Sequence, residues 1–165
     1  MCNLNRRLKI HRIAKTARAS AELKARRSGF SNNLGGFCAR GSAILHRHLS
    51  RSGLKSTICF TRGHVWVWCD PFVVDITATQ FGIHRDVLIF TEKSLGRIQR
   101  IAKSTHPHFW DMEKCEQFKH PSQFRDHQIH IEWTQPNGMI TKSEAEVIFS
   151  PEDRCRRLAW NLNNS

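Results

Sequence analysis

The hydrophobic pattern near the N-terminus predicts a long amphipathic helix. Between Leu4 and Arg27 there is no proline or glycine, and apolar residues recur every three or four positions, as on one face of a helix. The apolar positions are Ile10, Ile13, Ala14, Ala17 and Ala21, and the basic positions on the other side are Arg6, Arg7, Lys9, Arg12, Lys15 and Arg18. Glycine and asparagine within 28–36 end this pattern. We therefore expect a basic helix or arm over residues 1–30, followed by one domain over residues 31–165.

After residue 36 the pattern predicts one helix and then short strands. An apolar stripe predicts a helix over 38–48, with Gly53 beyond its end. Runs of β-branched and aromatic residues predict strands over 54–61, 64–68, 73–77 and 86–90, and a later strand over 128–133. Helical spacing returns over 93–103 and from Ser150 onward, whereas 106–124 shows no clear period. This order of elements predicts an α+β fold.

The net charge of +12 is confined to the N-terminal third of the chain. Residues 1–55 hold 13 Lys and Arg against one acidic residue, Glu22, whereas residues 56–165 hold 13 basic and 13 acidic residues. Such a segment favours an anionic partner, namely nucleic acid, an anionic membrane surface or an acidic protein. The predicted helix has no aromatic residue to stack on bases, so nucleic-acid binding through it is expected to be non-specific.

The composition also bears on compartment and cofactors. No apolar run approaches the ~20 residues of a membrane span, and none has the place of a signal peptide, so we expect a soluble, cytoplasmic protein. Six cysteines occur without a CxxC pair, which predicts reduced thiols. The most suggestive group of possible ligands matches no metal motif and comprises His106, His108, Cys115 and His120. Neither a metal nor another cofactor is expected.

Cys38 has the setting of a catalytic nucleophile. It begins the predicted second helix, where the helix dipole and unpaired N–H groups favour a thiolate, and Gly35 and Gly36 let the backbone turn before it. A nucleophilic thiol also needs a base within hydrogen-bond reach, and that base needs a fixed orientation. A lone cysteine in such a place is more often a buried hydrophobic residue, so the interpretation depends on finding both partners.

The two strands that follow supply those partners. If they form a hairpin around Asp70-Pro71, position 68 faces 73 and position 66 faces 75. His64 and Asp75 then share a face as diagonal neighbours, roughly 7–8 Å apart at Cα, which is within reach of an imidazole–carboxylate hydrogen bond. Trp66 and Trp68 lie on the same face and are predicted to line a substrate groove. We therefore predict a triad of nucleophile, base and orienting group.

Three stretches around the triad carry a family resemblance. They read G-F-C-A-R-G-S-A-I-L, G-H-V-W-V-W and V-V-D-I-T-A-T-Q-F-G, and the resemblance covers roughly 34–82. This pattern resembles the core of transglutaminase-like proteins within the papain-like superfamily, in particular small bacterial and phage members. The resemblance implies a nucleophile at a helix N-terminus packed on an antiparallel sheet, and acyl transfer through a thioester on Cys38. It further implies that His64 shuttles the proton, that Asp75 holds the imidazole and that the Cys38 N–H helps to bind the oxyanion.

The expected oxyanion donor departs from the family pattern, and the role of one nearby glutamine is not assigned. Papain-like peptidases place a glutamine a few residues before the nucleophile as an oxyanion donor, and here Asn32 and Asn33 occupy that zone. Gln80 is a candidate for supporting the site or binding substrate. The expected activity is that of a cysteine protease, with deamidase or transglutaminase as alternatives, on amide bonds of a peptide or protein. A different hypothesis, from the charge pattern, is a non-catalytic binding module acting through the N-terminal arm.

Overall fold

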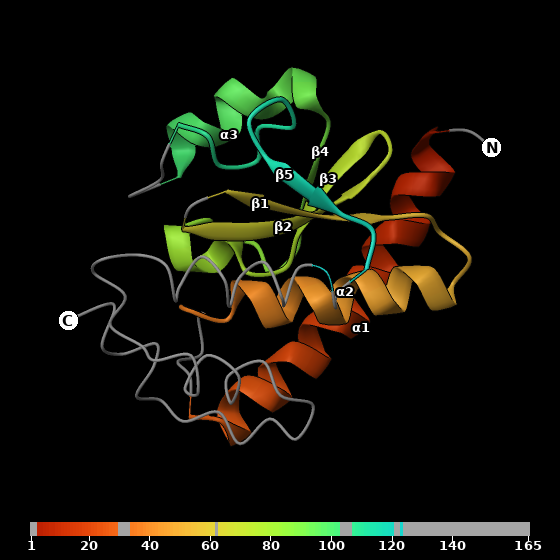
Figure 1. Cartoon of the computed structure of the whole chain (residues 1–165), viewed down its shortest axis with the longest axis vertical. Coiled ribbons are helices and arrows are strands. Elements are labelled where there is room, and N and C mark those ends of the chain that lie inside the picture. The colour runs from red at the N-terminus through yellow and green to blue at the C-terminus, as the bar shows by residue number, and fades with distance from the viewer. Residues whose placement is uncertain (1–2, 30–33, 62, 103–106, 121–122, 124–165) are drawn as a thin grey trace.

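The computed structural model describes residues 3–29, 34–61, 63–102, 107–120 and 123, and it contains a five-stranded antiparallel sheet flanked by helices (Figure 1). The strands are β1 (Thr57–Thr61), β2 (His64–Cys69), β3 (Phe72–Asp75), β4 (Leu88–Phe90) and β5 (Glu116–Phe118). Their order across the sheet is β4-β3-β2-β1-β5. The first four strands therefore pair with their neighbours in sequence, and β5 returns to add itself to the edge of β1.

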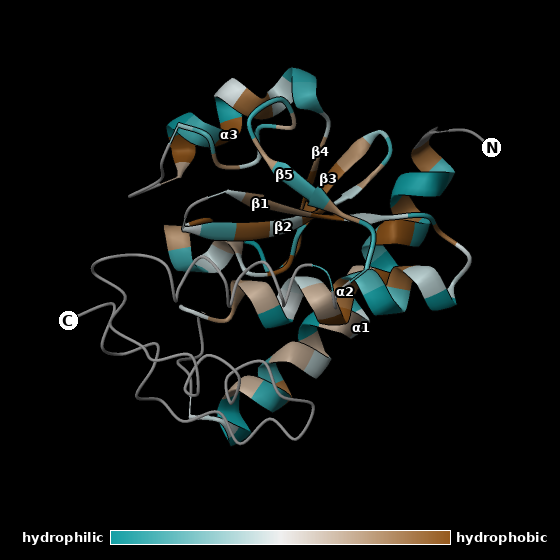
Figure 2. Cartoon of the chain, viewed as in Figure 1, coloured by the Kyte–Doolittle hydropathy of each residue, from teal (hydrophilic) through white to brown (hydrophobic). Residues whose placement is uncertain are grey.

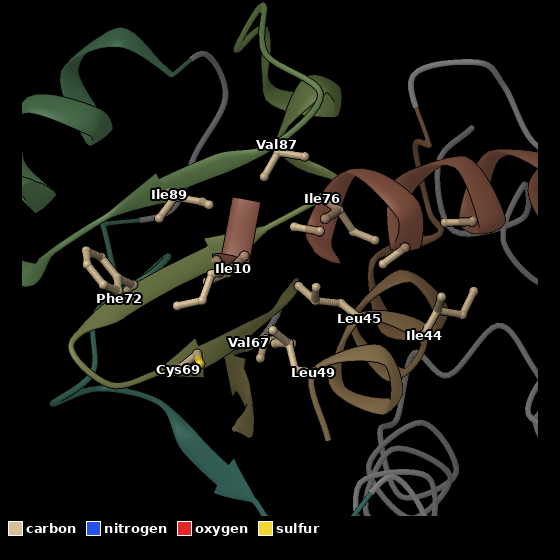
Figure 3. Packing of buried hydrophobic residues seen from close by; sticks show 14 of the residues in the cluster. Ile10, Ile44, Leu45, Leu49, Val67, Cys69, Phe72, Ile76, Val87 and Ile89 are labelled. Atoms are coloured by element: carbon tan, nitrogen blue, oxygen red, sulfur yellow. The ribbon is translucent and has the colours of Figure 1, made fainter. Parts of the chain in front are cut away.

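Helices cover the sheet and confirm the predicted α+β class. Two long helices, α1 (Asn3–Arg27) and α2 (Cys38–Arg51), share one buried cluster with residues of the sheet (Figure 3). Shorter helical segments follow the sheet strands and comprise η1 (Ala78–Phe81), η2 (Glu92–Ser94) and α3 (Leu95–Ile101). Within the described ranges, no helix is long and apolar enough to cross a membrane.

The predicted elements up to residue 103 are present with shifted ends, but β5 was not predicted. This strand lies inside 106–124, where two of its three side chains are exposed and the sequence has no alternating pattern. It forms because β1 offers an unpaired edge, with Ile58 opposite Phe118. The strand predicted over 128–133 and the helix predicted from Ser150 lie outside the described residues.

The sheet is buried on both faces. Alternation along β2 sends Val67 and Cys69 into the cluster shared with α1 and α2, and sends Trp66 and Trp68 toward the opposite face. The opposite face is covered by the segment that contains α3 and by residues 109–115. A polar residue on this second face is therefore enclosed between the sheet and those segments.

α1 docks on the body through the apolar stripe that its sequence predicts. Ile10, Ala14, Ala17 and Ala21 are fully buried and belong to the same cluster as Leu45 of α2. Figure 2 shows hydrophobic and hydrophilic residues interspersed along this helix. Because alanine is small, the backbones of the two helices can approach closely where they cross.

Three basic side chains of α1 also bind the body. Arg18 is buried, and its Nη1 donates hydrogen bonds to the carbonyl of Ile76 and, at 3.0 Å, to Oγ1 of Thr79. Arg7 and Lys9 each donate to a backbone carbonyl of the body, both at 3.2 Å. Part of the positive charge of the N-terminal segment therefore fixes the helix in place.

Gly41 allows α2 to lie close to the chain that follows β3. A Cβ atom built on Gly41 would lie 2.7 Å from Cγ2 of Thr77, which is shorter than a normal contact. A Cβ atom built on Gly96, in α3, would have no other atom within 4 Å. The two glycines thus differ in the space around them although both lie in helices.

We predict that Gly41→Ala destabilises the fold by about 1–3 kcal/mol, because the added methyl group displaces Thr77. The matched change Gly96→Ala should be neutral or stabilising by up to about 1 kcal/mol, since alanine favours helix and finds open space. Urea unfolding of the two variants measures both effects. Equal stabilities for the two variants would contradict the close approach at Gly41.

Candidate active site

The hairpin of β2 and β3 brings His64 and Asp75 together. Its register pairs Val67 with Val74 and Trp68 with Val73, which is the register that the sequence predicts. His64 opens β2 and Asp75 ends β3, so the two residues are diagonal neighbours on one face. His64 Nε2 lies 2.6 Å from Asp75 Oδ2, and both side chains are about 1% exposed. The pair is a short hydrogen bond in a nearly dry environment.

Further donors surround the Asp75 carboxylate. Its Oδ1 accepts hydrogen bonds from the backbone N–H of Thr77 at 2.7 Å and from the Thr77 hydroxyl at 2.9 Å. Its Oδ2 accepts a second bond from Nε1 of Trp110 at 2.8 Å. Burial acts to raise the pKa of Asp75, but the charge and hydrogen bond of His64, together with Thr77 and Trp110, outweigh it and lower that pKa. Asp75 is therefore an oriented carboxylate.

The His64 imidazole is held in its protonated form. Burial by itself would lower the pKa of His64, but the Asp75 carboxylate, with a smaller contribution from Cys38, raises it to about 9. At neutral pH the pair is thus an imidazolium beside a carboxylate. Its Nε2–H donates to Asp75, which leaves Nδ1 as the second proton-carrying nitrogen of the ring.

Cys38 lies near enough to the same imidazole to influence it. It is the first residue of α2, is 6% exposed and packs against Val65, which follows His64 on β2. Its thiol contributes to the raised pKa of His64, which brings sulfur and ring into one electrostatic unit. Nδ1 is buried and makes no well-formed hydrogen bond within the described residues. A thiol–imidazole contact that is long or poorly aligned is common before substrate binds.

Aromatic rings enclose His64. Phe81, Phe109, Trp110 and Trp66 have ring centroids 4.7, 5.1, 5.6 and 5.8 Å from that of the imidazole. Such rings exclude water, and their faces attract a cation. The enclosure therefore strengthens the interaction with Asp75, which outweighs the cost of burying the charged imidazolium.

Sequence reasoning missed the residues that complete this enclosure. Phe109 and Trp110 come from 106–124, where the sequence has no period, and Gln99 of α3 fixes their segment by donating to the carbonyls of Pro107 at 2.7 Å and Phe109 at 3.1 Å. No local pattern signals these contacts. Thr77 was detectable, because a threonine two residues after an aspartate commonly bonds back to its carboxylate.

The other predicted site residues differ in how close they lie to this centre. Gln80 donates from Nε2 to the carbonyl of Thr77 at 3.1 Å and so supports the turn after Asp75. Trp66 is fully buried beside His64, whereas Trp68 is partly exposed and lines a groove at the other end of β2. Asn32 and Asn33 lie outside the described residues. Within the described residues, the backbone N–H groups at the start of α2 are the remaining candidates for an oxyanion site.

Metal-ligand geometry is absent from the described residues. No three His, Cys, Asp or Glu side chains in those ranges are close enough together to hold an ion. His106 lies outside the described residues. The described Cys–His–Asp arrangement supports proton transfer and nucleophilic chemistry by its own side chains.

The raised pKa of His64 predicts how stability depends on pH. Because the folded pKa of about 9 exceeds the ordinary value of 6.5, this group stabilises the fold fully below pH 6.5 and loses that contribution as pH rises through 9. Urea unfolding from pH 6 to 10 should show stability falling by up to about 1.4 kcal/mol per pH unit from this group. The His64→Gln variant should show a smaller decline. An equal decline in both proteins would mean that other groups cause it.

No protein-family model, curated protein or solved structure matches this chain. The function of the site is therefore argued from its own geometry and from the sequence pattern around it.

Proposed function

We propose that this chain is a thiol-dependent amidohydrolase or acyltransferase with a papain-like, transglutaminase-like core. The observation that carries the proposal is the buried His64–Asp75 hydrogen bond of 2.6 Å together with the influence of Cys38 on the same imidazole. The nucleophile at the start of α2, packed on an antiparallel sheet, supports the family assignment made from the sequence pattern. Peptide or protein amides are the proposed substrates.

The chemistry follows from the proton positions. The thiolate of Cys38, paired with the His64 imidazolium, attacks the carbonyl carbon of the amide. The oxyanion of the tetrahedral intermediate lies toward the N–H groups at the start of α2. His64 then protonates the departing nitrogen, the C–N bond breaks and a thioester remains on the sulfur. Throughout these steps Asp75 keeps the imidazole oriented and stabilises its positive charge.

The second half of the reaction decides the enzyme class. Water, deprotonated by His64, attacks the thioester and releases a carboxylic acid, which gives a protease on a peptide bond or a deamidase on a glutamine side chain. An amine that attacks instead forms a new amide, which gives a transglutaminase. In each case the thiolate leaves and the catalyst is regenerated. Of these we favour the protease, with deamidase and transglutaminase as alternatives.

The positively charged N-terminal segment is proposed only as an accessory to this activity. Three of its basic side chains already make hydrogen bonds that hold α1 on the body, namely those of Arg7, Lys9 and Arg18. Arg12 and Lys15 are exposed on the same helix and remain for an anionic partner. Binding through the arm stays a prediction, with no described contact that favours it over the thiol chemistry.

We predict that iodoacetamide at neutral pH alkylates Cys38 before the other thiols, and that His64→Ala slows this step by about tenfold or more, because the imidazolium that stabilises the thiolate is lost. Peptide mapping by mass spectrometry measures the rate at each of the six cysteines. The control is His46→Ala, which removes a different buried histidine, one that lies on α2. In this variant Cys38 should be alkylated at nearly the wild-type rate. Cys115 is the reference thiol, since it is more exposed than Cys38.

An activated ester tests the acyl step itself. p-Nitrophenyl acetate should give a burst of nitrophenolate and an acetyl group on Cys38, and Cys38→Ser should abolish both. Acetylation spread over all thiols, or alkylation of Cys38 that does not change in His64→Ala, would contradict the proposed function.

A further inference from the structure

A basic groove lies at the end of the fold away from the candidate active site. It has a volume of about 870 Å³. Its lining is His46, Arg47, Ser50, Gly53, Leu54, Lys55, Ser56, Thr57, Trp68, Asp70, Lys119 and His120. Cys38 begins α2 whereas Arg47 lies near its other end, which separates them by ~13 Å along the helix axis. His64 and Trp68 are likewise at opposite ends of β2.

Three segments bring basic side chains into this groove. His46 and Arg47 come from α2, Lys55 from the turn before β1, and Lys119 and His120 from the chain after β5, which runs toward α2 in Figure 1. The lining contains a single carboxylate. Within the described residues, no ion pair neutralises the arginine or the two lysines.

The positive charges lie close enough to act on one another. Burial lowers the pKa of His46, and the positive charges of His120 and Arg47 lower it further. The three groups belong to two segments that are far apart in the sequence, so the fold itself gathers this charge. An anion placed among them would relieve that repulsion.

The groove also has fixed polar groups and an aromatic ring. His46 is buried, and its Nδ1 lies 3.0 Å from the hydroxyl of Ser56, which orients the ring. Trp68 is partly exposed in the lining, and the hydroxyls of Ser50 and Thr57 lie in the same wall. Convergent donors beside a partly exposed tryptophan suit a ligand that carries both negative charge and a flat ring.

We propose that this groove binds a nucleoside phosphate, either as a free nucleotide or as part of a single strand. Arg47, Lys55 and Lys119 hold the phosphate oxygens, and the base stacks on Trp68. The volume is within the range of small-ligand sites. This inference is independent of the proposed thiol chemistry, because the groove shares no residue with the Cys38, His64 and Asp75 group.

Two double variants with the same change in charge test the site. Arg47→Gln with Lys119→Gln removes two groove cations, and the control Lys93→Gln with Arg97→Gln removes two exposed cations from η2 and α3. Calorimetric titration with ATP, AMP and inorganic phosphate, and anisotropy with a labelled single-stranded oligonucleotide, measure binding by the full chain. We expect the groove variant to bind about tenfold more weakly, because two charge-assisted contacts are lost, and the control variant to stay near wild type.

Trp68→Leu separates stacking from charge. It should weaken nucleotide and oligonucleotide binding but leave inorganic phosphate unchanged, since phosphate has no ring to stack. Mononucleotide binding identifies a free nucleotide as the source, and binding of the oligonucleotide alone identifies a strand. Cys38→Ser should bind like wild type, which keeps this test separate from the thiol chemistry.

Two results would overturn the site. One is an equal loss of affinity in both double variants, which would indicate general attraction to a cationic protein. The other is nucleotide binding that does not depend on Trp68 and the groove cations. Circular dichroism of every variant shows that a loss of binding does not come from unfolding.

Discussion

The buried hydrogen bond between His64 and Asp75 is the interaction on which the candidate site depends. Either charge alone, removed from water, would be strongly disfavoured, whereas together each stabilises the other. Thr77 and Trp110 satisfy the remaining carboxylate positions, and aromatic rings keep water out. Removal of one partner would leave an uncompensated buried charge. The pair, its donors and its enclosing rings therefore act as one unit.

The rest of the fold holds this unit and brings the thiol to it. Arg18 of α1 donates a hydrogen bond to the carbonyl of Ile76, the residue directly after Asp75. The N-terminal helix therefore holds the backbone next to the carboxylate. Gly41 lets α2 approach Thr77, which itself donates to Asp75. The same helix begins at Cys38. The position of α2 against the sheet thus sets both its distance to Thr77 and the location of the Cys38 sulfur.

The sequence predicts the central pair better than its surroundings, for a physical reason. His64 and Asp75 follow from local rules, because strand alternation and a short turn fix which side chains share a face. Trp110 and Phe109 depend on contacts between distant segments, which no local period encodes. The edge strand β5 was missed for the same reason, since pairing with β1 and not its own pattern creates it. Asn32 and Asn33 remain candidates outside the described residues.

The imidazole of His64 offers the most direct measurement. Titration followed by nuclear magnetic resonance of the ring should show His64 protonated at neutral pH, with a pKa of about 9 that decreases in Cys38→Ser, because the sulfur contributes to it. A His64 ring that titrates near its ordinary value of 6.5, with no change in the Cys38→Ser variant, would contradict the coupling of thiol, imidazole and carboxylate.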